Sequence, residues 1–158
     1  MAISVASALV SSRLEYANSV LFGCPQKHAA RLQRVQQALA RVVMQQSSVS
    51  PLTSTELLKQ LYCLPIEWRI RFKLACLVHK ILNTGHPPYL TKLIQYHKPS
   101  LPVTFCSATQ PSFGARAFRV AAPKIWNSIP LHICQSQTYS SFRRHFKTHY
   151  FISAHLAP

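Results

Sequence analysis

The chain has very few acidic residues. Its 158 residues include only three acids against 18 lysines and arginines, which gives a formal net charge of +15, and aspartate does not occur. Polymerases and metal-dependent nucleases hold two cations with clustered carboxylates. The acids of this chain, Glu15, Glu56 and Glu67, are scattered along the sequence. We therefore expect no two-metal phosphoryl transfer and no enzyme active site, because only these glutamates could orient a catalytic base.

The chain also lacks the CxxC spacing typical of zinc sites. Among its five cysteines and eight histidines, the set that comes nearest to a metal site is Cys134 with His145 and His149, with Cys106 as a fourth donor. This spacing is loose, and the odd number of cysteines argues against a secreted disulfide scaffold. We interpret the cysteines as reduced core residues of an intracellular protein and expect no metal and no cofactor.

Long apolar runs are absent as well. No stretch approaches the roughly 20 apolar residues that span a bilayer. No basic residue precedes Arg13, so the first residues do not have the pattern of a signal peptide. We expect a protein that does not enter a membrane, is not secreted, and resides in the nucleus or the cytoplasm.

Apolar residues are nevertheless plentiful, at 48% of the chain, which is enough for one core. Their periodicity predicts a mainly α fold. The expected architecture is a helical bundle with a proline-rich, partly extended C-terminal segment and a final amphipathic helix. We expect a helical region over residues 1–97, with residues 98–158 packed on it as part of one domain. The individual helices are predicted at residues 1–21, 26–46, 53–62, 66–82 and 89–96, with a last helix capped by residues 136–138.

A dense apolar stretch at residues 113–133 interrupts the polar C-terminal part. Proline suits the first turn of a helix and stops one that it follows, so Pro123 and Pro130 predict a short helix over residues 122–129. Its Ile125 and Trp126, together with Phe118, are expected to dock against neighbouring helices, because a buried tryptophan removes about 150–250 Å² from water. A strand pairing of residues 101–106 with residues 116–120 is an alternative for part of this stretch.

The predicted helix at residues 26–46 has one apolar and one basic face. The expected core face is Leu32, Val35, Leu39, Val42 and Val43. The basic face is Lys27, Arg31, Arg34 and Arg41, and no acid in the helix pairs with it. The alternatives for this face are a phosphate-contacting surface and an ordinary solvated surface.

Two later helices carry further cations. Arg69 and Lys73 lie on the helix at residues 66–82, and Arg143, Arg144 and Lys147 lie on the last helix. Each of these helices also has aromatic residues at helical spacing. We interpret Trp68 and Phe72, and the stripe of Tyr139, Phe142, Phe146 and Tyr150, as core residues in preference to base-stacking surfaces.

The charge imbalance indicates a polyanionic partner. Self-repulsion at this net charge works against a compact state unless phosphates or an acidic body lie nearby. We therefore expect contacts with the phosphate backbone of RNA or DNA.

Several blocks of the sequence resemble the carboxy-terminal region of reverse transcriptases from jockey-like non-LTR retrotransposons. They are SRLEYANSVLFG (12–23), LQRVQQALARVV (32–43), LPIEWRIRFKLACLVHKILN (64–83), PPYLTKLI (87–94), RAFRVAAPKIWNSIPLHI (116–133) and SFRRHFKTHYF (141–151). The order of the blocks matches that family. Glu15, where aspartate is common, and Ala115, where a charged or polar residue often stands, depart from its pattern.

The resemblance implies that residues 1–97 correspond to the helical thumb and the remainder to the tail beyond it. In that family the palm, with the aspartates that bind catalytic metals, lies upstream, so none of the catalytic residues has a counterpart here and a palm domain is an implied partner. Three hypotheses follow: a non-catalytic remnant that binds nucleic acid, a degenerate translated fragment without activity, and a protein-interaction module in which Trp126 and the Phe142 stripe face a partner.

Overall fold

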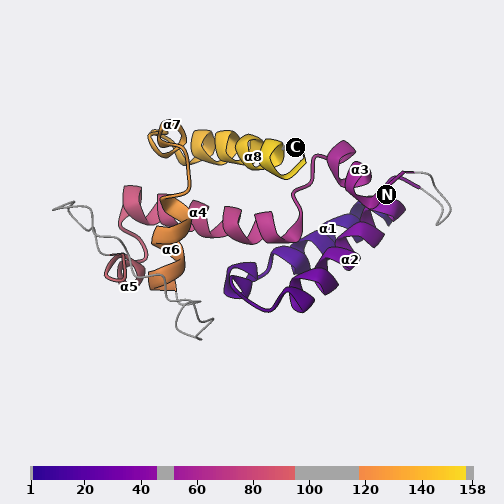
Figure 1. The fold of residues 1–158 in the computed structure, drawn as a ribbon, viewed down its shortest axis with the longest axis horizontal. Coiled ribbons are helices and arrows are strands. Elements are labelled where there is room, and N and C mark those ends of the chain that lie inside the picture. Colours follow the sequence, from indigo (N-terminus) through magenta and orange to yellow (C-terminus); the bar gives the residue numbers. More distant parts are fainter. Residues whose placement is uncertain (1, 46–51, 95–117, 156–158) are drawn as a thin grey trace.

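A computed structural model describes residues 2–45, 52–94 and 118–155 of the chain (Figure 1). These residues are mainly helical and contain no strand, so the expected mainly α fold is confirmed for them. The helices are α1 (Ala2–Glu15), the 3₁₀ helix η1 (Asn18–Leu21), α2 (Gln26–Val43), α3 (Ser54–Gln60), α4 (Ile66–Thr84), α5 (Pro88–Thr91), α6 (Phe118–Trp126), α7 (Leu131–Cys134) and α8 (Tyr139–His155). The expected extended segment after residue 97 and the strand at residues 101–106 lie outside the described residues.

Helix α4 is the centre of the fold. Figure 1 shows it running across the molecule with α8 alongside, α6 crossing its C-terminal half, and α1 and α2 near its N-terminal end. Its buried residues include Ile66, Ile70, Leu74, Ala75 and Val78, which lie around most of its circumference. A helix that is apolar on most sides needs neighbours on most sides. The long predicted helix therefore organises the other elements around itself.

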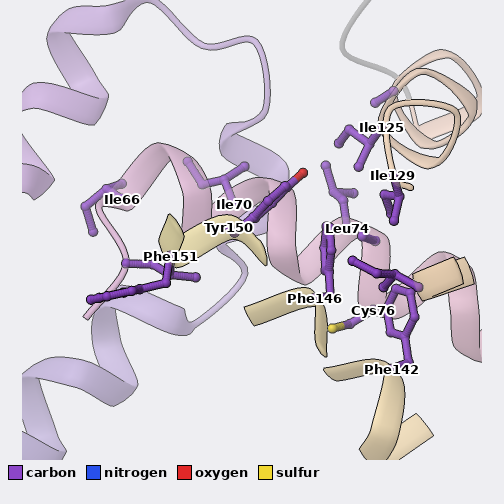
Figure 2. Close-up of a cluster of buried hydrophobic side chains, with 14 of the residues drawn as sticks. Ile66, Ile70, Leu74, Cys76, Ile125, Ile129, Phe142, Phe146, Tyr150 and Phe151 are labelled. Carbon is purple, nitrogen blue, oxygen red and sulfur yellow. The ribbon is translucent and has the colours of Figure 1, made fainter. Parts of the chain in front are cut away.

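Aromatic side chains join α4 to α8, which runs antiparallel to it (Figure 2). The ring centroids of Phe72 and Phe146 are 5.6 Å apart, and those of Trp68 and Tyr150 are 4.8 Å apart. Phe142 and Phe146 are both fully buried. The interpretation as core is thus confirmed for Phe142, Phe146 and Tyr150, whereas Trp68 and Phe72 are half-buried against the core and Tyr139 is 42% exposed.

We call these aromatic contacts between α4 and α8 the seam. His79 lies at its end nearest the start of α8. It is 1% exposed, and its ring stacks on Phe142 with centroids 4.1 Å apart. Its Nε2 lies 3.1 Å from the carbonyl oxygen of Ser136, and the side-chain amide of Asn83 lies within 3.3 Å of the ring nitrogens. A buried imidazole with partners for its nitrogens satisfies the requirement that buried polar groups be paired. His79 therefore fixes the entry of α8 against α4.

Helix α3 begins with a complete capping box. The Glu56 N–H donates to the Thr53 Oγ1 at 3.3 Å, and the Thr53 N–H donates back to the Glu56 carboxylate at 2.8 Å. Its Leu57 and Leu58 are buried against Ala40 of α2 and form a second, smaller cluster. This cluster holds α3 against α2.

The predicted apolar face of α2 is wrong in part. Val35 and Val42 are 48% and 55% exposed, whereas Gln36 and Ala40 are buried. The Gln36 Nε2 donates to the Leu64 carbonyl at 2.8 Å, and the small Ala40 allows α3 to approach. Because of this hydrogen bond and this close contact, α2 faces the protein with Gln36 and Ala40, and the side with Val35 and Val42 is exposed.

Two further predicted helices end earlier in the structure. The first helix ends at Glu15 because Ala17 is in the left-handed conformation, with φ 48°, and a 3₁₀ turn follows it. The helix expected at residues 89–96 is only the single turn α5. In contrast, α4 ends as predicted, with Gly85 in the left-handed conformation at φ 68°.

The predicted helix at residues 122–129 begins too late. Phe118 to Val120 are already helical, so the strand alternative is wrong for these residues, and Pro123 lies inside α6. Proline removes the bond to the carbonyl one turn earlier, that of Arg119. Burial of Ala121, Ala122 and Ile125 against the core offsets this loss. Pro130 does stop the segment, and the unpredicted turn α7 follows it.

Replacing Phe142 tests the importance of the seam. Phe142→Ala should lower the free energy of unfolding by about 3–5 kcal/mol, the usual cost of truncating a buried phenylalanine. Ile152→Ala on the same helix is the control, because Ile152 is 50% exposed and should change stability by about 0.5 kcal/mol or less. Urea denaturation followed by circular dichroism measures both, and equal effects would contradict the assigned core.

Replacing Thr53 tests the start of α3. Thr53→Ala should cost about 1 kcal/mol, because a backbone N–H of the first turn loses its acceptor. Thr55→Ala, inside the same helix, is the control without a capping role.

The effect of Thr53→Ala should also depend on pH. Hydrogen bonds from Thr53 hold the pKa of Glu56 below its ordinary value of 4.5 in the folded protein. A lowered folded-state pKa adds stability above the ordinary pKa, and that stability is lost as the pH falls through the lowered value. The difference between wild type and variant should shrink in acid, and a difference that grows there would contradict the capping box.

Candidate nucleic-acid interface

The basic face of α2 is a continuous strip on the outside of the protein. Successive helical residues are about 100° apart, so Lys27, Arg31, Arg34 and Arg41 lie within about 80° of one another around the helix. All four are exposed. The buried Gln36 lies on the opposite side of the helix. We call these four residues the α2 strip.

Two glutamines help to hold α2 with this strip facing outward. The Gln33 Oε1 accepts the first N–H of α4, that of Ile66, at 2.8 Å. The Gln36 Nε2 donates to the Leu64 carbonyl, also at 2.8 Å. Both bonds satisfy backbone groups at the start of α4 that the helix itself leaves without partners. The strip is therefore fixed by bonds on the opposite side of the helix.

Every acid of the chain already has a partner within the protein. Glu15 pairs with Arg69 at 3.2 Å, Glu67 pairs with Arg71 at 2.6 Å, and Glu56 belongs to the capping box of α3. In the described part of the chain, Lys27, Arg31 and Arg34 have no hydrogen-bond or ion-pair partner. Their charges are available to an external anion.

Arg41 differs from the other three residues of the strip. Its Nη2 donates to the Ser54 hydroxyl at 3.1 Å, which ties the end of α2 to the start of α3. The residue remains exposed, and a hydroxyl does not neutralise its charge. Arg41 can therefore contact a phosphate while keeping this position.

Arg69 is placed differently from what a phosphate-contacting residue needs. Its side chain is only 15% exposed, its Nε donates to the Leu64 carbonyl at 3.0 Å, and its Nη1 pairs with Glu15. These contacts tie α1 to the start of α4. We therefore do not assign Arg69 to the phosphate-contacting surface.

The remaining predicted cations lie along α4 and α8. Lys73 is exposed on α4, and Arg143 is exposed on α8. The Lys147 Nζ lies 5.0 Å from the centre of the Tyr62 ring, and the Arg143 guanidinium lies 5.6 Å from that of Tyr139. These contacts over aromatic rings orient the two side chains. Arg144 is exposed on α8.

The three predicted docking residues lie against the protein's own core. Ile125 is 4% exposed within it, while Phe118 and Trp126 are half-buried and pack against its edge. The rings of Trp126 and Phe142 have their centroids 5.8 Å apart. Phe142 is fully buried, so the expectation that the Phe142 stripe faces a partner is wrong for this residue, whereas Trp126 keeps part of its surface exposed.

The thiols and imidazoles do not converge on a metal site in the described residues. No group of three or more histidine, cysteine or acidic side chains there has metal-binding geometry, and Cys106 of the sequence-derived set lies outside them. Burial and the neighbouring His132 lower the pKa of His149, and burial raises the pKa of Cys76 to about 11. A thiol with so high a pKa is a poor nucleophile at neutral pH.

One feature of the surface has no counterpart in the sequence-based predictions. A groove of about 350 Å³ runs along α2 beside the strip and is bounded by α4 and the end of α8. Its lining includes Gln26, Gln33, Gln37, Pro65, Trp68 and His155. The spacing of Gln26, Gln33 and Gln37 places all three on one side of α2. The other walls of the groove come from residues distant in sequence, so the sequence alone does not predict it.

In the described ranges 2–45, 52–94 and 118–155, none of the helices has the length and apolar character needed to cross a membrane. Comparison of the whole chain with protein-family models, with curated proteins and with solved structures found no match.

Proposed function

We propose that this chain is a non-catalytic basic helical module that binds the phosphate backbone of RNA or DNA. Its ancestry would be the carboxy-terminal region of a non-LTR retrotransposon reverse transcriptase, which the sequence blocks resemble. The implied partners are a nucleic acid and a reverse transcriptase palm domain, and the implied location is the nucleus or the cytoplasm.

The observation that carries the proposal is the α2 strip. Lys27, Arg31 and Arg34 are exposed on one side of a helix and have no partner among the described residues. Cations in such an array repel one another, and an anionic chain relieves that repulsion while releasing its own counterions. Binding to a phosphate backbone therefore stabilises both the strip and the complex.

The cations of α8 form a second basic set, on the helix that packs along α4. Arg143, Arg144 and Lys147 supply three more positive charges, and Lys73 supplies one on α4. We assign them a supporting role, because two of the side chains are already oriented over aromatic rings of the protein. The α2 strip is thus the primary contact.

A charge-matched pair of variants tests the proposal. The triple variant Lys27→Gln, Arg31→Gln and Arg34→Gln should bind a single-stranded RNA of eight nucleotides more weakly than wild type at low salt. The slope of log affinity against log salt should fall by about 2, because each lost phosphate contact to a single strand removes about 0.7 from that slope. Fluorescence anisotropy across a salt series measures both quantities.

The control variant removes the same charge elsewhere. Lys59→Gln, Lys80→Gln and Lys92→Gln replace three exposed lysines of α3, α4 and the turn after α5. This variant should keep nearly the wild-type slope. If both triple variants lose affinity and slope equally, the protein attracts RNA only by net charge, and the assignment to the α2 strip is wrong.

The hypothesis of a degenerate fragment makes a different prediction. A chain without specific packing would show no near-ultraviolet circular dichroism and no cooperative thermal transition. The seam between α4 and α8 leads us to expect both signals, because its rings are held at fixed distances by neighbours. Their absence in the wild-type protein would favour the degenerate fragment.

A further inference from the structure

The groove along α2 combines features that the phosphate-binding proposal does not use. Its volume of about 350 Å³ falls at the lower end of the range for small-molecule pockets, about 300–1,000 Å³. One wall is a row of glutamines on α2, another is the beginning of α4, and His155 of α8 also lines it. The groove is therefore both polar and apolar, and it is large enough for one planar ring system.

The glutamine wall offers unsatisfied hydrogen-bonding groups. In the described residues, Gln26 and Gln37 have no hydrogen-bond partner, and the carbonyl of Gln33 is occupied by the Ile66 N–H, which leaves its NH₂ group. A carboxamide presents a donor beside an acceptor, the arrangement with which glutamine recognises the N6 and N7 edge of adenine. The wall matches the edge of a nucleobase.

The opposite wall is rigid and includes an aromatic ring. Trp68 is held edge to face by Tyr150, with centroids 4.8 Å apart, and the Arg71 guanidinium lies 5.6 Å from the centre of its indole ring. His155 is fixed as well, because its Nε2 lies 3.1 Å from the Cys63 carbonyl. Aromatic walls favour planar bases, which unpaired strands can turn outward.

The glutamine wall of the groove lies next to the α2 strip around the helix, although none of the four strip residues lines the groove. Gln37 lies about 60° around the helix from Arg34 and about 40° from Arg41. A nucleotide whose phosphate contacts these arginines has its base within reach of the glutamine wall. Arg71, beside Trp68, is paired with Glu67, which also lines the groove.

We propose that this groove binds an unpaired base, with adenine preferred, of the single strand whose backbone lies on the α2 strip. This inference rests on the proposed phosphate-binding function. Binding to the phosphate backbone alone does not require bases. The proposed groove does, and it also requires that the strand be unpaired.

Two ligands of equal charge separate base binding from backbone binding. The probes are an RNA of eight adenylates and an eight-residue strand in which every base is absent. The adenylate strand should bind about tenfold more tightly at the same salt concentration, the size expected for contacts with one stacked base. It should also change the fluorescence of Trp68, measured in a Trp126→Phe background because the chain has two tryptophans.

A glutamine variant tests whether the difference in affinity between the two strands arises in the groove. Gln37→Ala should remove most of the preference for the adenylate strand and leave the affinity for the abasic strand unchanged. Gln60→Ala, at an exposed position at the end of α3, is the matched control and should keep the preference. Thermal melting of each variant establishes that it is folded.

The outcomes distinguish the two proposals. Equal affinity for both strands would overturn base binding and leave phosphate binding intact. A preference that survives Gln37→Ala would place base recognition outside the groove and also overturn the inference. Binding of neither strand by a folded protein would overturn both proposals, and quenching of Trp68 only by an aromatic peptide would identify the groove as a protein-binding site.

Discussion

The packing of α8 along α4 is the interaction on which the rest of the structure depends. With three acids in the chain and two of them in ion pairs, charge pairing cannot hold this protein together. The cohesion comes instead from aromatic contacts such as those of Phe72 with Phe146 and His79 with Phe142. Because those rings are neutral and buried, the lysines and arginines are left on the surface. The apolar seam and the basic exterior therefore have one cause.

The functional proposal follows from how the acids are placed. Each glutamate stabilises a junction between elements or the first turn of a helix, so none of the three is paired with the α2 strip. The glutamines of α2 have the complementary role. Gln33 and Gln36 attach the helix to the beginning of α4, and Gln37 faces the groove beside the strip. The same helix thus anchors α4, presents a cationic surface and carries the proposed base-contacting wall.

The sequence predicts the local features of this fold well and its non-local features poorly. The capping box of α3, the Gly85 cap and the length of α4 depend on neighbouring residues, and all were predictable. The buried face of α2 was not, because a hydrogen bond from Gln36 to a carbonyl 28 residues away outweighs the burial of Val35. The groove was missed for the same reason, since α2, α4 and α8 meet only in the folded chain.

The most direct test of the central claim is a titration of the isotope-labelled protein with the eight-adenylate RNA, followed by amide chemical shifts. The account predicts that the largest changes fall on α2, between Gln26 and Arg41, and on the start of α4 near Trp68. Changes distributed over all basic helices in proportion to their charge would contradict it, because the protein would then attract RNA without a defined surface.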